Sequence, residues 1–227
     1  MKLSFRCLRG AVVAAAASVA LASCVSAPEA PGAPAEIAVA APVAEPAPAV
    51  EAVPVREDLP PLIAEALAAL DAHRSQVPLH DKIGVVDFSL PSREPRFFVV
   101  DVATGQVERS WLVAHGSGSD PNATGMVERF SNQPGSNASS RGAYLTANAY
   151  VGQHGLSRRL VGLDADNNMA MDRAIVIHGA DYVSETMAER QGRIGRSQGC
   201  FAFAPEEVVE VMQELGEGRM IYAGKLS

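Results

Sequence analysis

The sequence predicts a mainly β domain of the α+β class, with a mixed sheet and a few peripheral helices. Three observations support this prediction. Strand-like apolar runs follow one another, with short turns between them, from residue 83 to residue 115. A continuous apolar run at 174–177 is typical of a buried strand. Apolar residues recur at helical spacing in two segments, one just after residue 60 and one near residue 210.

The first 56 residues lack the apolar periodicity of a folded region, so residues 57–227 are expected to form one domain. Residues 1–23 begin with three basic residues and continue with an apolar run, 11–22, that is too short to span a bilayer. This arrangement is typical of a secretory signal peptide. Its removal takes away three of the 19 basic residues and none of the 26 acidic ones, so the net charge changes from −7 to −10. That charge argues against a nucleic-acid partner.

The end of this segment, Leu21-Ala22-Ser23-Cys24, resembles a bacterial lipobox. In such a motif the cysteine becomes the first residue and carries acyl chains that anchor the protein to a membrane. Val25 follows instead of aspartate, which favours the periplasmic side of the outer membrane. Ordinary cleavage after Ala22, which leaves a soluble periplasmic protein, is the alternative. Residues 24–56 contain seven of the 15 prolines and many alanines, which predicts a semi-extended, lipid-anchored linker.

The folded region is expected to begin with an amphipathic helix. Asp58 and the two prolines that follow it offer a cap and a first turn that tolerates proline, and apolar residues then share one face as far as Arg74. Strand-like runs come next at 83–88, 96–102 and 106–115. Because turn residues separate them, these runs are expected to form a β-meander.

The second half of the domain alternates irregular and regular segments. Residues 116–142 are rich in Gly, Ser, Asn and Pro, and a loop of this length is expected to be functional or disordered. The turn at 164–168 imitates the start of a calcium loop but lacks the required glycine and bidentate glutamate, which predicts a polar turn. A helix between Pro205 and Gly216 and a strand at 219–223 are expected to end the chain.

The chemistry is expected at His178 and Cys200. Cys200 is the only cysteine outside the predicted signal peptide and anchor, so the domain has no partner for an intramolecular disulfide. His178-Gly179 ends the predicted buried strand, and Cys200 follows 22 residues later, after a glycine-punctuated loop. A histidine can deprotonate a cysteine nucleophile and later protonate a leaving amine. We expect the sulfur to lie beside the imidazole at the mouth of a groove, where it ionises readily; a buried structural thiol and a core histidine are the alternatives.

These residues resemble the catalytic domain of the L,D-transpeptidases, the YkuD-type family, whose signature is His-Gly followed by Ser-His-Gly-Cys. The resemblance is strongest over residues 173–203, in a branch that reads Arg-Ser-x-Gly-Cys, here 196–200. It extends more weakly to Ala114-His115-Gly116 and to 140–144. It implies an L,D-transpeptidase-like fold, a β-sandwich or mixed sheet, and it implies peptidoglycan stem peptides as the partner. No cofactor is expected, and a monomer is expected.

The resemblance implies that Cys200 attacks the carbonyl between a diamino acid's L-centre and the terminal D-alanine of a tetrapeptide stem. His178 then takes the thiol proton and returns it to the departing D-alanine. Transfer of the thioester to an amine of a neighbouring stem forms a 3→3 cross-link, whereas transfer to water makes the enzyme a carboxypeptidase or endopeptidase. The resemblance also implies that a backbone carbonyl, rather than an acid, orients the histidine.

Two departures from the signature leave recognition of a substrate carboxylate open. Gln198 replaces the signature histidine, and Phe201-Ala202 replaces an apolar-arginine pair. We expect Arg196 or Arg193 to supply the missing positive charge, with a solvated loop surface as the alternative for both. The other candidates are Ser197, Gln198, Gly199 and Gly179 for the oxyanion hole and its loop, and His115 and Tyr144, beside the two arginines, for substrate binding. His73, His80 and His154 show no chemistry in the sequence.

Competing interpretations fit the residues less well. Sortases use a wider gap and a Thr-x-Thr-Cys strand, and papain-like enzymes place cysteine before histidine. A zinc site built from His115, His178 and Cys200 lacks metal-ligand spacing, so no metal is expected. The remaining alternative to an enzyme is a non-catalytic peptidoglycan-binding lipoprotein with a silent site.

Overall fold

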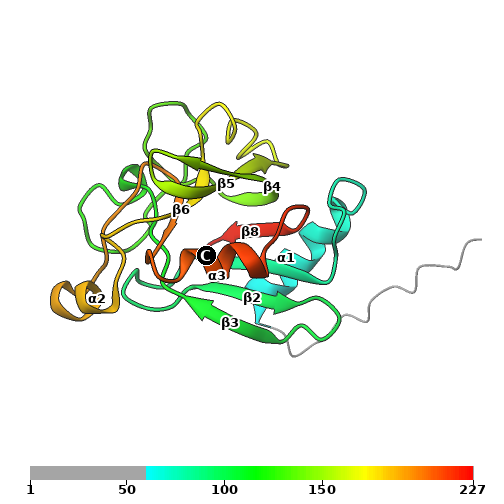
Figure 1. The fold of residues 1–227 in the computed structure, drawn as a ribbon, viewed down its shortest axis with the longest axis horizontal. Coiled ribbons are helices and arrows are strands. Elements are labelled where there is room, and N and C mark those ends of the chain that lie inside the picture. Colours follow the sequence, from blue (N-terminus) through cyan, green and yellow to red (C-terminus); the bar gives the residue numbers. More distant parts are fainter. Residues whose placement is uncertain (1–59, 227) are drawn as a thin grey trace, which may run out of the picture. The chain divides into compact units, whose positions relative to one another are not determined.

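The computed structural model describes residues 60–226, so the predicted signal peptide, Cys24 and the linker lie outside the described residues. In this region the strands form one mixed sheet in the order β3-β2-β1-β8-β4-β5-β6-β7 (Figure 1). The predicted mainly β fold with a mixed sheet is confirmed. The strands are β1 (Lys82–Asp87), β2 (Phe97–Asp101), β3 (Val107–Trp111), β4 (Gly142–Gly152), β5 (Gly155–Gly162), β6 (Val176–Gly179), β7 (Phe201–Phe203) and β8 (Met220–Gly224).

The first helix, α1 (Pro61–Ala72), lies where it was predicted, but it ends two residues before Arg74, and its N-cap residue is Pro60 rather than Asp58, which lies outside the described residues. It begins with a proline, whose missing N–H costs nothing in a first turn. One face is buried and packs with β1 and β8. The residues that bury this face are Leu62, Ile63, Ala66 and Leu70. In the described part of the chain, no helix has both the length and the apolar character that a membrane crossing requires.

The predicted meander is also confirmed, because β1 pairs antiparallel with β2 and β2 with β3. The C-terminal strand β8 lies in the middle of the sheet, parallel to β1 and antiparallel to β4. Beyond β3, Ala114 pairs with Ala202 of β7 through a hydrogen bond of 2.9 Å. The two ends of the strand order therefore meet, and this contact brings the chain after β3 next to the chain around Cys200.

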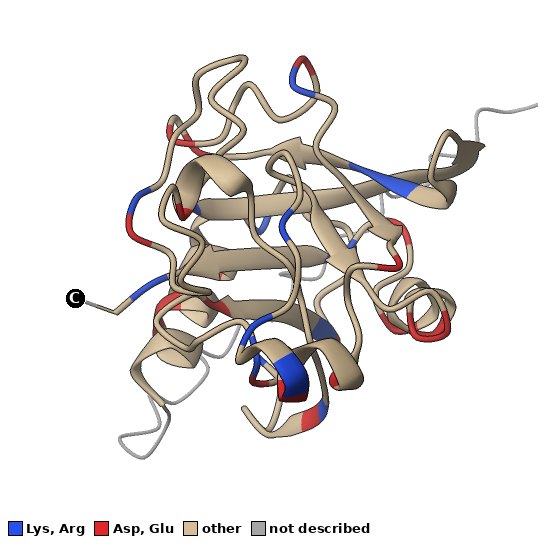
Figure 2. Cartoon of the chain, turned by 90° about the vertical axis from the view of Figure 1, so that its left-hand side faces the viewer, with Lys and Arg blue, Asp and Glu red and all other residues tan. Residues whose placement is uncertain are grey.

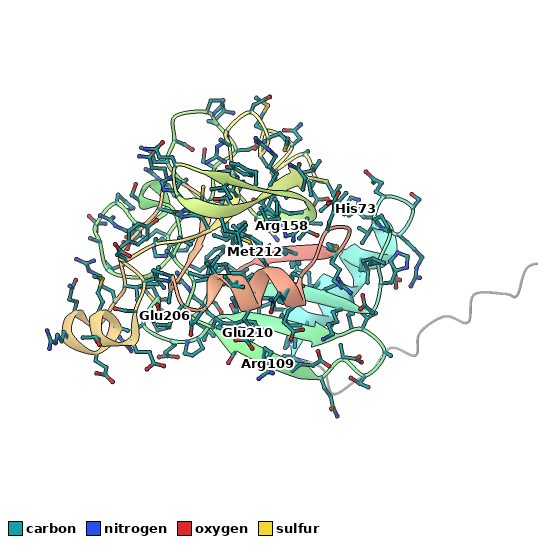
Figure 3. All side chains as sticks on the ribbon, viewed as in Figure 1. His73, Arg109, Arg158, Glu206, Glu210 and Met212 are labelled. Atoms are coloured by element: carbon teal, nitrogen blue, oxygen red, sulfur yellow. The ribbon has the colours of Figure 1, made fainter. Side chains whose placement is uncertain are left out.

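The C-terminal helix α3 (Val208–Glu214) packs on the core that is formed by aromatic side chains of several strands. Phe97 and Phe203 meet edge to face within this core, with 4.9 Å between ring centroids. Arg158 of β5 reaches the helix and donates a hydrogen bond to the carbonyl oxygen of Met212 at 3.4 Å (Figure 3). The helix is thereby tied to β5, the neighbour of β6.

The structure adds two elements that the sequence pattern did not predict. One is the hairpin of β4 and β5, whose inner half is buried and whose outer half is exposed. The other is a short helix, α2 (Glu185–Gln191), which Ser184 caps by accepting the N–H of Met187 at 3.2 Å. Gly192 ends this helix in the left-handed conformation. Both elements lie beside the chain segments that carry His178 and Cys200.

The long loop at 116–142 folds back on itself and contains only one short 3₁₀ helix, η1 (Ser117–Ser119). Ser139 connects its two arms: its N–H donates to Ser119 Oγ at 2.9 Å, and its Oγ accepts the N–H of Gly116 at 3.0 Å. The predicted polar turn behaves as expected, because the carboxylate of Asp164 accepts the N–H of Ala143 at 2.7 Å. These bonds hold the loop against the strands that carry the site.

Acidic and basic residues are interspersed over the domain in the view of Figure 2. With a net charge of −7 for the whole chain, the protein offers an anionic polymer no long-range attraction. Recognition of such a polymer therefore has to come from individual groups at a site.

Candidate active site

Cys200 and His178 line the same pocket, which has a volume of about 610 Å³. Volumes of this size are typical of sites for small molecules or short peptides. The sheet explains why His178 and Cys200 lie close together, because β6 and β7 are parallel neighbours and His178 lies opposite Ala202. Cys200 directly precedes β7 and therefore lies beside the beginning of β6. The loop at 134–137 and the β4–β5 turn complete the pocket walls.

The His178 ring is fixed by its own strand end. Its Nδ1–H donates to the carbonyl oxygen of Gly179 at 2.9 Å, which leaves Nε2 without a proton in the neutral ring. Burial of the ring lowers the pKa of His178 below its ordinary value. The imidazole is therefore neutral at neutral pH, and Nε2 can accept a proton. Gly179 contributes this orienting carbonyl and does not line the pocket.

The thiol of Cys200 is partly exposed and donates a hydrogen bond to the carbonyl oxygen of Ala174 at 3.6 Å. Burial raises the pKa of Cys200, while a hydrogen bond from the Val176 backbone and the charge of Arg173 act in the opposite direction. Our expectation that the sulfur ionises readily is therefore wrong for the resting site. Together, the two pKa shifts favour a thiol and a neutral imidazole over a thiolate–imidazolium pair.

Ser197 organises the loop that precedes Cys200. Its Oγ donates to the carbonyl oxygen of Cys200 at 2.8 Å and accepts the N–H of Gly199 at 3.1 Å. Its own N–H donates to the carbonyl oxygen of His115 at 2.9 Å. The N–H groups of Ser197 and Gly199 are thus already engaged, which corrects the expectation that they serve the oxyanion hole. Gln198 is exposed and lines the pocket.

Gly199 is required at its position for two reasons. Its φ is +117°, which L side chains rarely adopt. A Cβ there would also lie 2.7 Å from the carbonyl oxygen of Ala138 and 3.0 Å from Nη2 of Arg173. The backbone of Gly199 is therefore packed closely against Ala138 and Arg173.

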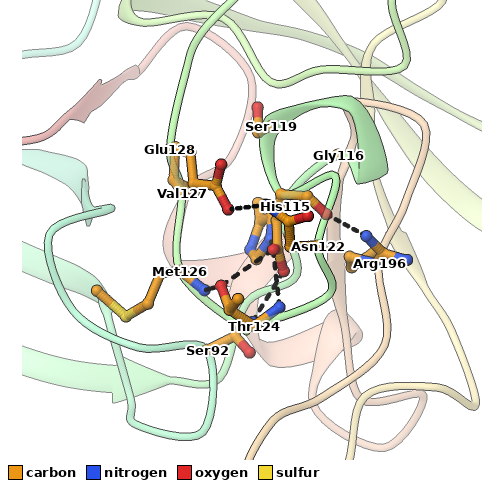
Figure 4. Close-up of polar contacts among 12 residues, drawn as sticks. Ser92, His115, Gly116, Ser119, Asn122, Thr124, Met126, Val127, Glu128 and Arg196 are labelled. Atoms are coloured by element: carbon orange, nitrogen blue, oxygen red, sulfur yellow. Dashed lines mark hydrogen bonds and ion pairs between the residues drawn. The ribbon is translucent and has the colours of Figure 1, made fainter.

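His115 does not contact the pocket, so its prediction as a substrate-binding residue is wrong. The side chain of His115 (Figure 4) is fully buried. Its Nδ1 accepts a hydrogen bond from Arg96 at 2.6 Å, and its Nε2 faces the carboxylate of Asp120 at 3.4 Å. Burial, followed by the charge of Arg96, lowers the pKa of His115 to about 4. The ring is neutral and structural, and its backbone carbonyl supports Ser197.

Tyr144 is also outside the pocket, and its prediction as a substrate-binding residue is wrong for the same reason. Its ring is fully buried and packs edge to face on Phe201, with 5.4 Å between centroids. Its hydroxyl donates to the carbonyl oxygen of Ser140 at 2.8 Å. Tyr144 therefore supports β7 from inside the core rather than touching a ligand.

Of the two arginines that we expected at the site, only Arg196 lines the pocket. Its Nη1 donates to the carbonyl oxygen of Asp120 (Figure 4). Arg193 lies elsewhere, since its Cβ would be 2.9 Å from a Cβ placed on Gly125. The prediction that Arg193 binds substrate is therefore not supported by its position.

Two residues that sequence reasoning missed belong to the pocket, His154 and Arg173. The ring of His154, in the β4–β5 turn, stacks on the ring of His178 with 4.4 Å between centroids and 28° between planes. Finding His154 would have required predicting the hairpin, which the sequence pattern does not reveal. Arg173 was recognised only as the start of the motif-like segment, and nothing in that motif marks it as functional.

We expect His154→Ala to move the acid limb of the pH–activity profile to higher pH. His154 covers the His178 ring, and its charge lowers the pKa of His178, so its removal weakens both causes of that low pKa. A base with a higher pKa is protonated, and therefore inactive, at a higher pH. Initial rates from pH 4 to pH 9 measure this, with His80→Ala as a control far from the pocket. An unchanged acid limb would show that the stacking has no electrostatic consequence.

The sequence matches the profile of the L,D-transpeptidase catalytic domain over residues 58–223. No curated protein shows a significant similarity to the chain.

Similar solved structures include an L,D-transpeptidase from Mycobacterium smegmatis, with 13% identity, a TM-score of 0.38 and coverage of 63% of this chain and 58% of that one. Another is an L,D-transpeptidase from Xylanimonas cellulosilytica, with 17% identity, a TM-score of 0.38 and coverage of 70% and 69%. A helical cell shape determining protein from Campylobacter jejuni has 10% identity, a TM-score of 0.42 and coverage of 66% and 49%. The chain thus spans less than two thirds of the mycobacterial structure.

Proposed function

Because the chain belongs to the L,D-transpeptidase catalytic domain family, we propose that it is a peptidoglycan enzyme in which Cys200 forms a thioester with tetrapeptide stems. One observation carries the proposal: the only cysteine of the described region and a histidine with an unprotonated Nε2 line one pocket. A thiol and a neutral base are the pair that nucleophilic acyl transfer needs. A silent wall-binding site would have no need of this pairing.

The proposed reaction starts from the neutral pair. The S–H bond of Cys200 turns from Ala174 toward Nε2 of His178, which accepts the proton as sulfur attacks the carbonyl before the terminal D-alanine. The negative charge then develops on the former carbonyl oxygen. We assign its stabilisation to the backbone N–H of Cys200, with that of Gln198 beside it, because those of Ser197 and Gly199 are engaged.

Collapse of the tetrahedral intermediate breaks the C–N bond and leaves the acyl group on sulfur. The imidazolium of His178 gives its proton to the departing amine of D-alanine, which restores the neutral base. The same ring then deprotonates the incoming nucleophile. An amine of a neighbouring stem yields a 3→3 cross-link, and water yields a shortened stem, so the carboxypeptidase or endopeptidase alternative shares the same thioester.

The charges of the pocket suit a stem that carries both an amine and carboxylates. Arg196 offers a guanidinium and Asp172 a carboxylate on the wall of the same pocket. We assign Arg196 to a carboxylate of the stem and Asp172 to an amine, by charge complementarity. The position of Arg196 on the pocket wall supports this assignment.

We further propose that the enzyme works in the cell envelope, on the periplasmic side, and is anchored by lipid at Cys24. The support is the signal-like segment 1–23, the lipobox-like Cys24 and the proline-rich linker up to residue 56. The catalytic domain, residues 57–227, would then reach the wall from the outer membrane as a monomer.

The proposed function is tested with purified protein and defined muropeptides. We expect incubation with tetrapeptide monomers to release D-alanine, and to form dimers if an amine is the acceptor, both measured by mass spectrometry. If tripeptide monomers form and dimers do not, water is the acceptor and the enzyme is a hydrolase. If the stems stay unchanged while the protein still sediments with peptidoglycan, the non-catalytic wall-binding alternative is correct.

A further inference from the structure

Arg173 carries a positive charge that no protein carboxylate neutralises in the described region. Its Nη1 donates to the carbonyl oxygen of Ser131 at 2.8 Å and to Oγ of Ser140 at 3.3 Å. Its Nη2 donates to the carbonyl oxygen of Ala138. All three acceptors are neutral, and none of the ion pairs found within residues 60–226 includes Arg173. The guanidinium is held firmly, but its charge is available to an anion.

The position of this charge is next to the nucleophile. A Cβ built on Gly199 would lie 3.0 Å from Nη2 of Arg173, so the guanidinium packs against the residue that directly precedes Cys200. Arg173 also lines the pocket together with Cys200, and the next residue, Ala174, accepts the hydrogen bond of the thiol. Arg173 and Ala174 therefore both lie beside Cys200, Arg173 through its guanidinium and Ala174 through its carbonyl oxygen.

The other arginines are less suited to this role. Arg193 does not line the pocket. Arg196 lines it, but its Nη1 donates to the carbonyl oxygen of Asp120, whose carboxylate faces the buried ring of His115. Figure 4 shows Arg196 beside His115. Among charged groups, Arg173 is also the one that acts on the pKa of Cys200, and the direction is downward. Burial raises the pKa of Cys200, and the nearby positive charge of Arg173 lowers it.

We propose that Arg173 is the residue that stabilises negative charge on the sulfur of Cys200 and so compensates for the burial of the nucleophile. The inference rests on the proposed function, because it presupposes that Cys200 is the nucleophile. An opposite charge at close range commonly shifts a pKa by about 1 to 3 units. Such a charge favours the thiolate as the proton passes to His178.

The test measures the thiol directly and does not depend on peptidoglycan. We expect Arg173→Met to raise the pH midpoint of Cys200 alkylation by iodoacetamide by about one unit, and to lower the alkylation rate at pH 7 by about tenfold. Arg173→Lys keeps the charge and is expected to retain most of the wild-type midpoint. Arg196→Met is the matched control, because it removes a guanidinium from the same pocket and is expected to leave the midpoint unchanged.

Loss of the Arg173 hydrogen bonds could loosen the loop at 131–140, so a second measurement separates charge from structure. The ratio of alkylation rates with anionic iodoacetate and neutral iodoacetamide reports the local charge within one protein. We expect this ratio to fall severalfold in Arg173→Met and little in Arg173→Lys.

Three results would each overturn the proposal: the same pH midpoint of alkylation in wild type and Arg173→Met, the same midpoint in Arg173→Lys and Arg173→Met, or a larger shift of the midpoint in Arg196→Met than in Arg173→Met. Normal alkylation with no turnover of muropeptides would instead contradict the proposed function.

Discussion

Replacing Cys200 by alanine is expected to reduce release of D-alanine from tetrapeptide stems to background, a loss of at least about 10³-fold. The reason is that no other thiol exists in the described region, and His178 alone can only position water. Because the side chain is partly exposed and its hydrogen bond to Ala174 is long, the free energy of unfolding should change by no more than about 1 kcal/mol. Mass spectrometry of the muropeptides and thermal unfolding measure the two effects.

Cys200→Ser is the matched variant, since it keeps the size and the hydrogen-bonding capacity of the side chain. A serine hydroxyl is a far weaker nucleophile than a thiol beside the same neutral imidazole, so we expect its activity to be close to that of the alanine variant. Intact-protein mass spectrometry during turnover should show an acyl adduct in the wild type and none in either variant. Turnover that persists in Cys200→Ala would remove the thioester from the mechanism.

That His178 and Cys200 lie at one pocket was predictable because each residue belongs to a short local segment with a clear pattern. His178 ends an apolar strand, and Cys200 follows a Ser-x-Gly turn whose glycine the backbone requires. Ser197, which the motif marked as part of this loop, bonds to both Cys200 and Gly199. In each case the residues that determine the geometry lie within a few positions of one another.

The surroundings of His178 and Cys200 depend on contacts between residues that are far apart in the sequence. His115 ends the run after β3, but the loop at 116–142 folds over it and buries it completely. His154 lies in a hairpin whose outer half is exposed, so the strands show no continuous apolar alternation. Sequence periodicity reports burial, and it therefore gives no signal where a strand extends beyond the core.

The central place of β8 shows the same limit at the level of the fold. The final strand was predicted, but its insertion between β1 and β4 joins the first and second halves of the domain. The pairing of β8 with β1 and β4 depends on two clusters of buried apolar side chains. One cluster includes the buried face of α1, and the other includes the buried face of α3. Strand order of this kind is a property of the assembled core and is not encoded in any single segment.

Replacing His178 by glutamine is expected to lower the rate of D-alanine release by about 10²- to 10⁴-fold, the usual contribution of a general base. The amide keeps a polar group at the pocket but cannot take the thiol proton. In the wild type, burial and His154 hold the pKa of His178 below its ordinary value, so activity is lost only when the pH falls through that lowered pKa. In the variant this acid limb should disappear, and the residual rate should rise with pH as the thiol of Cys200, whose pKa is raised, ionises.

This pH dependence separates a base from a merely structural histidine. His178 is nearly buried and bonded to Gly179, so a loss of activity alone could come from disturbed packing. A variant that is only misfolded loses activity in proportion at every pH and unfolds at a lower temperature. We expect instead that His178→Gln regains activity toward high pH, where the thiolate forms without a base, and that added imidazole partly restores the rate near pH 7. The His154→Gln variant is the matched control, because it alters the stacked ring and leaves the base in place. A pH profile of His178→Gln that parallels the wild type would show that the ring does not transfer the proton.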